Sequence, residues 1–116
     1  MKTTINEILS IIEGNLLTAN AVEETIEFSG GYVSDLLSDV MGNAREHQIW
    51  ITIMRHLNVI AVASLANLSA VVFAKNVLPD QAVIQKANEE GICLINSSLS
   101  TFELTGRLYV LLNSKK

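Results

Sequence analysis

Hydrophobic residues are most concentrated in the middle of the chain, from position 49 to position 74. Residues 49–54 form a short run of β-branched and aromatic side chains, which is typical of a strand buried on both faces. Residues 57–67 are rich in alanine and suit a helix packed closely on a sheet, and residues 70–74 form a second apolar run. The pattern therefore predicts a buried strand, a polar loop, a helix and a second buried strand.

The same alternation continues to the end of the chain. Helices are expected at residues 80–90 and 101–112, with a strand at residues 92–95 between them. Pro79 is placed just inside the start of the first of these helices and Gly91 just past its end. Ser100 and Glu103 form a capping box for the last helix, in which Gly106 is expected to allow a close approach to the sheet. Such alternation predicts right-handed crossovers and a parallel sheet.

The amino-terminal part of the chain predicts a helix and two outer strands. Residues 4–13 form an amphipathic helix with a capping box at Thr4 and Glu7, and Gly14 is expected to end this helix. Residues 15–18 and 22–28 are strand candidates, which we assign to the outer positions of the sheet.

Residues 29–31, Ser-Gly-Gly, predict a sharp turn. After this turn, Ser34 is expected to cap a helix over residues 35–45, whose apolar side chains make one broad face. The chain of 116 residues has the length of one domain, and its pattern is that of the α/β class.

Composition adds an expectation about assembly and excludes some partners. Hydrophobic residues make up 49% of the chain and charged residues only 17%, which predicts a shared apolar interface and hence a homodimer. The net charge is -4, and no basic stripe is present, so nucleic acid is not an expected partner. Cys93 is the only cysteine, which excludes an internal disulfide, and its apolar neighbours favour an inert buried thiol.

Residues 57–74 carry no charge and approach the length of a membrane span. Four polar residues interrupt this stretch, Asn58, Ser64, Asn67 and Ser69, and they favour a soluble protein that does not cross a membrane. The first residues lack the apolar segment of a signal peptide, and a cytoplasmic location is therefore expected.

Polar side chains follow each of the three buried strands. They are Arg55, His56 and Asn58 after the first strand, Lys75 and Asn76 after the second, and Asn96, Ser97, Ser98, Ser100 and Thr101 after the third. Because the carboxyl ends of adjacent parallel strands open on one edge of a sheet, we expect these loops to form one polar rim. Arg55, His56, Lys75 and Ser100 would then point into a common depression that suits a small anion.

A simpler interpretation of the same residues is helix capping, by Asn58 for the helix at 57–67 and by Ser100 for the last helix. His56 has the chemistry of an acid or base, but no carboxylate or nucleophile lies at a telling spacing from it. The two histidines form no H-x-x-x-H pattern, so no metal site is expected. No catalytic residue and no cofactor are predicted.

Several stretches together carry a resemblance to a known family. They are residues 30–41 (GGYVSDLLSDVM), 50–53 (WITI), 56–65 (HLNVIAVASL), 102–103 (FE) and 106–109 (GRLY). These stretches resemble the small stand-alone members of the DRTGG-domain family, and the likeness spans nearly the whole chain. It implies one DRTGG-like domain over residues 1–116, with three α/β/α layers and a mostly parallel mixed sheet of about five strands, like the N-terminal domain of HPr kinase/phosphorylase.

The resemblance also implies regulation or assembly rather than chemistry, because small members occur near iron-only hydrogenase genes. Met54-Arg55-His56 stands where the family has Gly-Asp-Arg, and Ala74-Lys75-Asn76 stands where it has Thr-Gly-Gly. The kinase activity of the namesake belongs to a different domain, and no G-x-x-x-x-G-K-[ST] phosphate-binding motif is present in this chain.

The sequence therefore predicts a non-enzymatic regulatory or scaffolding domain that binds a partner protein or a small anionic ligand. The alternative is a small nucleotide or phosphometabolite sensor, or an enzyme, centred on His56 and Arg55.

Overall fold

The computed structural model of the chain describes residues 2–18 and 26–114. In chain order the elements are α1 (Ile5–Ile11), β1 (Gly14–Leu16), β2 (Gly30–Val33), α2 (Leu37–Asn43), β3 (Gln48–Thr52), α3 (Asn58–Leu65), β4 (Ala70–Phe73), α4 (Gln81–Glu90), β5 (Cys93–Ser97) and α5 (Thr101–Ser114). The predicted alternation of strands and helices from position 49 onward is confirmed, with bounds that shift by one or two residues.

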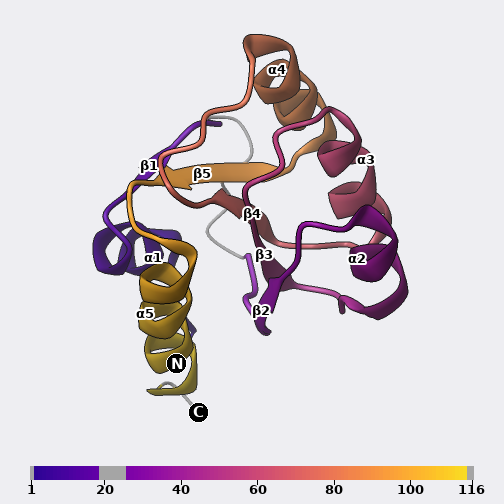
Figure 1. The fold of residues 1–116 in the computed structure, drawn as a ribbon. Helices are drawn as coiled ribbons and strands as arrows, with labels where there is room; N and C mark the ends of the chain where they lie inside the picture. Colours follow the sequence, from indigo (N-terminus) through magenta and orange to yellow (C-terminus); the bar gives the residue numbers. More distant parts are fainter. Residues whose placement is uncertain (1, 19–25, 115–116) are drawn as a thin grey trace.

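The five strands form one sheet in the order β1-β5-β4-β3-β2 (Figure 1). Strands β2, β3, β4 and β5 run parallel to their neighbours, and β1 pairs with β5 in the antiparallel direction. Each consecutive parallel pair is joined by one helix, which is the crossover geometry that the alternating sequence predicted. The sheet is therefore mixed and mostly parallel, as expected.

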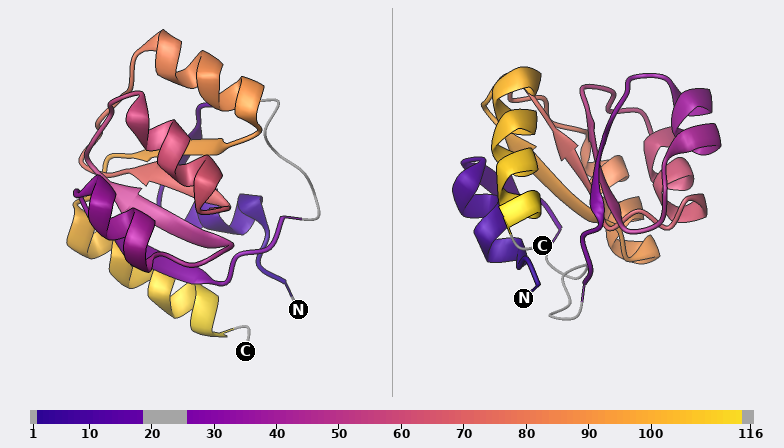
Figure 2. Two further views of the ribbon diagram at one scale, coloured as in Figure 1. Left: turned by 90° about the vertical axis from the view of Figure 1, so that its right-hand side faces the viewer. Right: turned by 90° about the horizontal axis from the view of Figure 1, so that it is seen from below.

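Helices cover both faces of this sheet and make three layers (Figure 2). One face packs Trp50, Val71 and Leu94 against α2, α3 and α4. The other face packs Ile51 and Val72, together with their neighbours, against α1 and α5. Successive side chains of a strand point to opposite faces of the sheet, so neighbouring residues enter these two separate cores.

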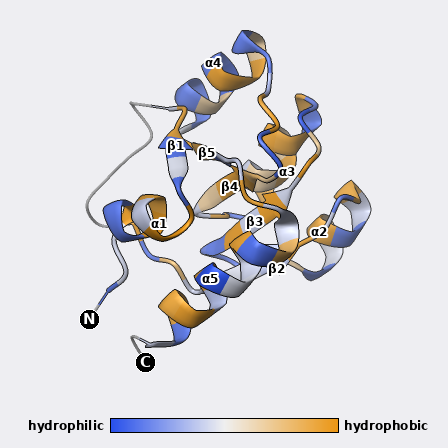
Figure 3. Ribbon diagram, turned by 60° about the vertical axis from the view of Figure 1, so that its left-hand side comes forward, coloured by the Kyte–Doolittle hydropathy of each residue, from blue (hydrophilic) through white to orange (hydrophobic). Residues whose placement is uncertain are grey.

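The central strands β3, β4 and β5 are buried along almost their entire length, which explains their continuous apolar runs. Helices α4 and α5 instead alternate hydrophobic and hydrophilic residues, because only one side of each contacts the sheet (Figure 3). The uncharged stretch at residues 57–74 forms α3, a turn and β4, and none of the helices that the structure describes is long and apolar enough to cross a bilayer.

The largest difference from the sequence prediction lies before α2. Residues 30–31 do not form a turn; they begin the edge strand β2, which pairs with β3. Helix α2 begins at Leu37, and Ser34 does not cap it: the Ser34 hydroxyl accepts a hydrogen bond from the backbone N–H of Leu36 instead, at 3.1 Å. Of the strand expected at residues 22–28, positions 22–25 lie outside the described residues and positions 26–28 form no strand.

Helix ends agree with the sequence prediction at some points and differ at others. The capping box of α1 is confirmed, with the Thr4 N–H donating to Glu7 at 3.0 Å and the Glu7 N–H donating to the Thr4 hydroxyl at 3.1 Å. Gly91 takes the left-handed conformation (φ 71°) that ends α4, as predicted. Pro79, however, is buried ahead of the N-cap residue Asp80 rather than inside the first turn of α4.

Two glycines have other roles than the sequence indicated. Gly14 opens β1 instead of ending α1, and a Cβ atom there would lie 2.9 Å from Ile95 Cγ2. Glycine is therefore needed for the close approach of β1 to the core. Gly106 lies on the exposed side of α5, where a Cβ atom would contact nothing within 4 Å, so the expected close approach of α5 to the sheet at this residue is wrong.

Candidate functional site

The polar loops that the sequence placed at one rim follow three strands that are indeed parallel neighbours. Strand β3 ends at Thr52, β4 at Phe73 and β5 at Ser97, and the loops leave from the same edge of the sheet. We call the loops at residues 53–57, 74–80 and 98–100 the strand-end rim. The amino-terminal ends of α3, α4 and α5 lie at this edge, with the positive ends of their dipoles toward it.

Arg55 links the first two loops of the strand-end rim. Its guanidinium Nη1 lies 3.4 Å from the carbonyl oxygen of Leu78, three positions after Lys75. Both Arg55 and Lys75 are exposed, and neither forms an ion pair with a carboxylate of the described residues. Two cationic side chains therefore extend from adjacent loops without a charged partner in that part of the chain.

His56 performs the capping role that the sequence assigned to Asn58. Its Nδ1 accepts a hydrogen bond from the backbone N–H of Asn58 at 3.1 Å, and Asn58 is the first residue of α3 rather than its cap. Because Nδ1 is the acceptor, the proton of the neutral imidazole lies on Nε2. Within the described chain His56 forms no ion pair with a carboxylate that would orient it as a base.

Lys75 and Asn76 both take the left-handed backbone conformation, with φ 59°. This conformation turns their N–H groups toward the next loop: Lys75 donates to the Leu99 carbonyl and Asn76 to the Ser97 carbonyl, each at 2.8 Å. The loops after β4 and β5 are thus joined by backbone hydrogen bonds. The side chains of Lys75 and Asn76 are exposed.

A row of three amides lies beneath this edge. Asn15 donates to the Oδ1 of Asn96, and Asn96 donates to the Oδ1 of Asn76, both at 3.2 Å. Asn96 is buried in the last part of β5. The sequence indicated that Asn96 follows the strand; it did not reveal that partners on β1 and after β4 satisfy a buried amide.

The remaining residues of the predicted site differ in their exposure to solvent. Ser97 is fully buried, and its hydroxyl donates to the Ile12 carbonyl at 2.6 Å, so it supports the loop from inside. Ser100 accepts a hydrogen bond from the Glu103 N–H at 3.2 Å and so caps α5, which begins at Thr101. Ser100 is exposed, and Thr101 is partly buried.

Asp35 is a polar residue at the same edge of the sheet that sequence reasoning assigned to a helix. Its carboxylate accepts hydrogen bonds from the Thr52 hydroxyl at 2.7 Å and from the Ile53 N–H at 2.9 Å. It therefore joins the end of β2 to the end of β3. The sequence signal was ambiguous, because an acid after serine is equally typical of a first helical turn.

A second polar cluster holds α2 on the sheet. Hydrogen bonds from Ser34 and Tyr32 lower the pKa of the Asp39 carboxyl, and burial acts in the opposite direction. The Tyr32 hydroxyl donates to Asp39 at 2.9 Å, and this hydrogen bond raises the pKa of Tyr32. Asn43 donates to the same oxygen at 3.0 Å, so the carboxylate is engaged by side chains of β2 and α2.

Cys93 is not available as a nucleophile. It is buried in β5, and desolvation raises the pKa of its thiol to about 12. A thiol with this pKa is protonated at neutral pH and unreactive. The location and the pKa agree with the inert thiol that the sequence favoured.

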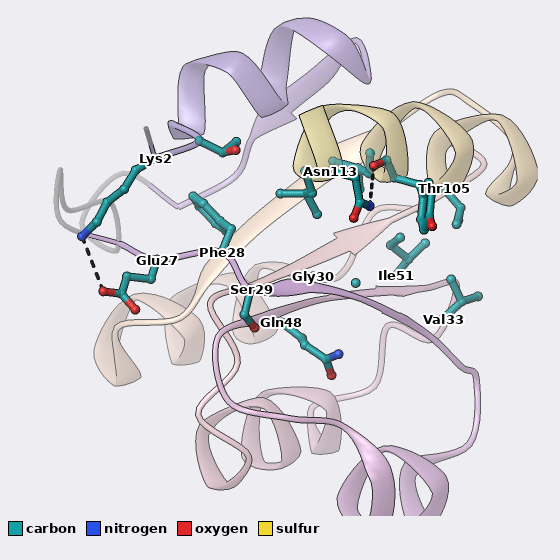
Figure 4. A pocket seen from close by; sticks show the side chains of 15 residues that line it. Lys2, Glu27, Phe28, Ser29, Gly30, Val33, Gln48, Ile51, Thr105 and Asn113 are labelled. Atoms are coloured by element: carbon teal, nitrogen blue, oxygen red, sulfur yellow. Dashed lines mark hydrogen bonds and ion pairs between the residues drawn. The ribbon is translucent and has the colours of Figure 1, made fainter. Parts of the chain in front are cut away.

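A cavity of about 620 Å³ lies at a different place, between β2 and α5 and next to Lys2 and Thr3 (Figure 4). We call it the β2–α5 hollow. Its lining residues are Lys2, Thr3, Glu27, Phe28, Ser29, Gly30, Gly31, Val33, Gln48, Ile51, Thr105, Leu108, Tyr109, Leu112 and Asn113. None of them belongs to the set that sequence reasoning selected, because an absence of side chains at an edge strand leaves no positive signal.

Comparisons with known proteins show the fold. No protein-family model matches the sequence, and no curated protein is significantly similar to it. A similar solved structure is the crystal structure of the CBS and DRTGG domains of the regulatory region of Clostridium perfringens pyrophosphatase, complexed with the activator diadenosine tetraphosphate. The TM-score is 0.74 over 93% of this chain, at 17% sequence identity.

The chain spans 46% of the length of that solved structure. At this identity the likeness shows a shared fold alone: the present chain has an α/β fold with a five-stranded mixed sheet that is also found in this region of CBS and DRTGG domains. The predicted α/β class with a mostly parallel mixed sheet of five strands is confirmed, and the likeness to the N-terminal domain of HPr kinase/phosphorylase stays a prediction.

Proposed function

We propose that the chain is a non-catalytic regulatory domain that binds a small anionic ligand at the strand-end rim. Arg55 and Lys75 would supply the charge, His56 Nε2 and the side chains of Asn76 and Ser100 would supply hydrogen-bond donors, and the helix amino termini would add their dipoles. A phosphate or polyphosphate group has the charge and the acceptor oxygens that such donors select.

The observation that carries this proposal is the distribution of unpaired cations. Among the described residues, Lys2, Lys86 and Arg107 each form an ion pair with a glutamate. Arg55 and Lys75 do not, although they extend from adjacent loops at one edge of the sheet. An anion would relieve the repulsion between two such charges.

The similar solved structure is consistent with this proposal, because it is a regulatory region whose activator is an anionic nucleotide. A catalytic function has less support, since His56 uses Nδ1 to cap α3 and Cys93 is buried. The cytoplasmic location and the association with iron-only hydrogenase systems stay predictions of the sequence.

Titration calorimetry with pyrophosphate and with ATP tests the proposal. We expect binding to the wild-type chain that weakens with added salt, and at least about tenfold weaker binding for the double variant Arg55→Gln/Lys75→Gln. Arg45→Gln is the matched control, because Arg45 follows α2 at the opposite edge of the sheet and forms no ion pair with the described residues. Equal losses for both variants, or no binding of either anion, would contradict the proposal.

We also propose that the chain forms a homodimer through α5. Three large apolar side chains on this helix are exposed to solvent, Phe102 by 89% and Tyr109 and Val110 by 68% each. Such a concentration of apolar surface is typical of an interface. Phe102 and Tyr109 are seven positions apart, which is about two helical turns, so they lie on the same side of the helix.

Light scattering should give about twice the chain mass of 12.7 kDa. Phe102→Glu should shift the population toward the monomer, because it would place a charge in the apolar contact. Leu65→Glu is the control, since Leu65 is 71% exposed on α3, on the opposite face of the sheet. A monodisperse wild-type monomer would contradict the dimer.

A further inference from the structure

The β2–α5 hollow originates in the sequence of the edge strand. Tyr32 packs with the core under α2, α3 and α4, so its neighbours Gly31 and Val33 face α5. Gly31 has no side chain to fill this side, and the position of a Cβ atom there would be 4.0 Å from Ile51 Cδ1. A space therefore stays open between the strand and α5.

Part of the wall of the hollow consists of apolar side chains that the core holds in place. Ile51 and Leu108 belong to the buried core and are 1% and 2% exposed. Phe28 and Leu112 pack against the same core from the sides. These side chains are held by the fold itself, so the hollow is a preformed space rather than a gap between mobile chains.

The polar side chains of the lining offer little to a bound molecule. The Oγ1 atom of Thr105 forms no hydrogen bond within the described part of the chain, but it has almost no accessible surface, so a molecule in the hollow would not reach it. Gln48 lies two positions before Trp50 and so faces α2 rather than α5, and its amide oxygen accepts from the Arg45 N–H at 2.6 Å. Binding in the hollow would therefore rest on its apolar walls.

The charges on the lining cancel each other. Lys2 and Glu27 are its two charged residues, and they form an ion pair at 3.4 Å (Figure 4). The hollow thus has no net charge to attract an anion, in contrast to the strand-end rim. Its volume lies within the range of about 300–1,000 Å³ that is typical of small-molecule sites.

From these observations we propose that the β2–α5 hollow is a second binding site, for an uncharged small molecule with an aromatic ring. The ring contacts Phe28, Ile51 and Leu108. This site does not depend on the anion site at the strand-end rim, because the two use different residues and opposite chemistry.

The test uses N-phenyl-1-naphthylamine, an uncharged fluorophore with two aromatic ring systems and one N–H donor. Titration into the wild-type chain should give a saturable rise in fluorescence with a stoichiometry of one site per chain. Gly31→Val places a side chain in the hollow, and its first atom meets only ordinary contacts, so the chain should fold and binding should weaken at least about tenfold.

Gly106→Ala is the matched control on α5, since it points into open space, and its affinity should equal that of the wild type. The variant Arg55→Gln/Lys75→Gln should also bind the fluorophore normally, which separates this site from the strand-end rim.

Amide chemical shifts of the wild-type chain make the test independent of variant folding. On addition of the fluorophore, shift changes should concentrate at Gly31, Thr105 and Leu108. Shift changes centred on other exposed apolar residues, such as Leu65, would overturn the proposal. So would a folded Gly31→Val variant that binds as tightly as the wild type.

Discussion

The strand-end rim and the β2–α5 hollow are formed by different parts of the structure. The rim consists of loops that backbone hydrogen bonds hold together, such as those from Lys75 to Leu99 and from Asn76 to Ser97. The hollow consists of core side chains around a place where one is missing, at Gly31. A rim of this kind follows from parallel topology alone, whereas the hollow depends on which residue occupies one position of one strand.

This difference has an energetic consequence. The charged residues of the rim are exposed and carry no ion pair in the described structure, so they contribute little to the folded state. The apolar lining of the hollow is shared with the core between the sheet and α5. Substitutions in the rim should therefore change ligand binding without changing the stability of the fold. Substitutions in the apolar lining of the hollow should change both.

The largest expected effect comes from Leu108→Ala. Leu108 is 2% exposed, and its truncation would enlarge the hollow and remove core contacts, at a cost of about 2–5 kcal/mol in the free energy of unfolding. The double variant Arg55→Gln/Lys75→Gln should change the same quantity by no more than about 0.5 kcal/mol. Urea denaturation followed by circular dichroism measures both.

This distinction between the two sites would fail if the double variant lost more stability than Leu108→Ala. A large loss in the double variant would show that Arg55 and Lys75 hold the loops together, and the rim would then be a structural feature rather than a binding surface. A loss below about 1 kcal/mol in Leu108→Ala would show that the wall of the hollow collapses without cost.

The central part of the fold was predictable because its signals are local. Continuous apolar runs mark β3, β4 and β5, and the capping residues Thr4, Ser100 and Gly91 mark helix ends. The order of strands and helices then predicted that the three parallel strands are neighbours. This adjacency alone places Arg55 and Lys75 at the same end of the sheet.

The edge strand β2 and the end of β5 were less predictable, because both depend on partners that are distant in the sequence. The segment Gly30–Val33 is short and begins with two glycines, and only pairing with β3 makes it a strand. Strand β5 extends to Ser97 because Asn15, Asn76 and the Ile12 carbonyl satisfy its two buried polar side chains. No local pattern reveals a partner that lies 81 or 85 positions away in the chain.

The smallest expected effect is a gain, from Gly106→Ala on α5. Gly106 lies inside the helix, and a Cβ atom there would meet nothing within 4 Å, so alanine should raise the free energy of unfolding by about 0.5–1 kcal/mol through its higher helix propensity. Urea denaturation at low protein concentration measures this gain for the single chain. At a concentration where the dimer forms, a smaller gain or a loss would indicate that a second copy packs against α5 at Gly106. An unchanged or lower stability at both concentrations would contradict the open environment of Gly106.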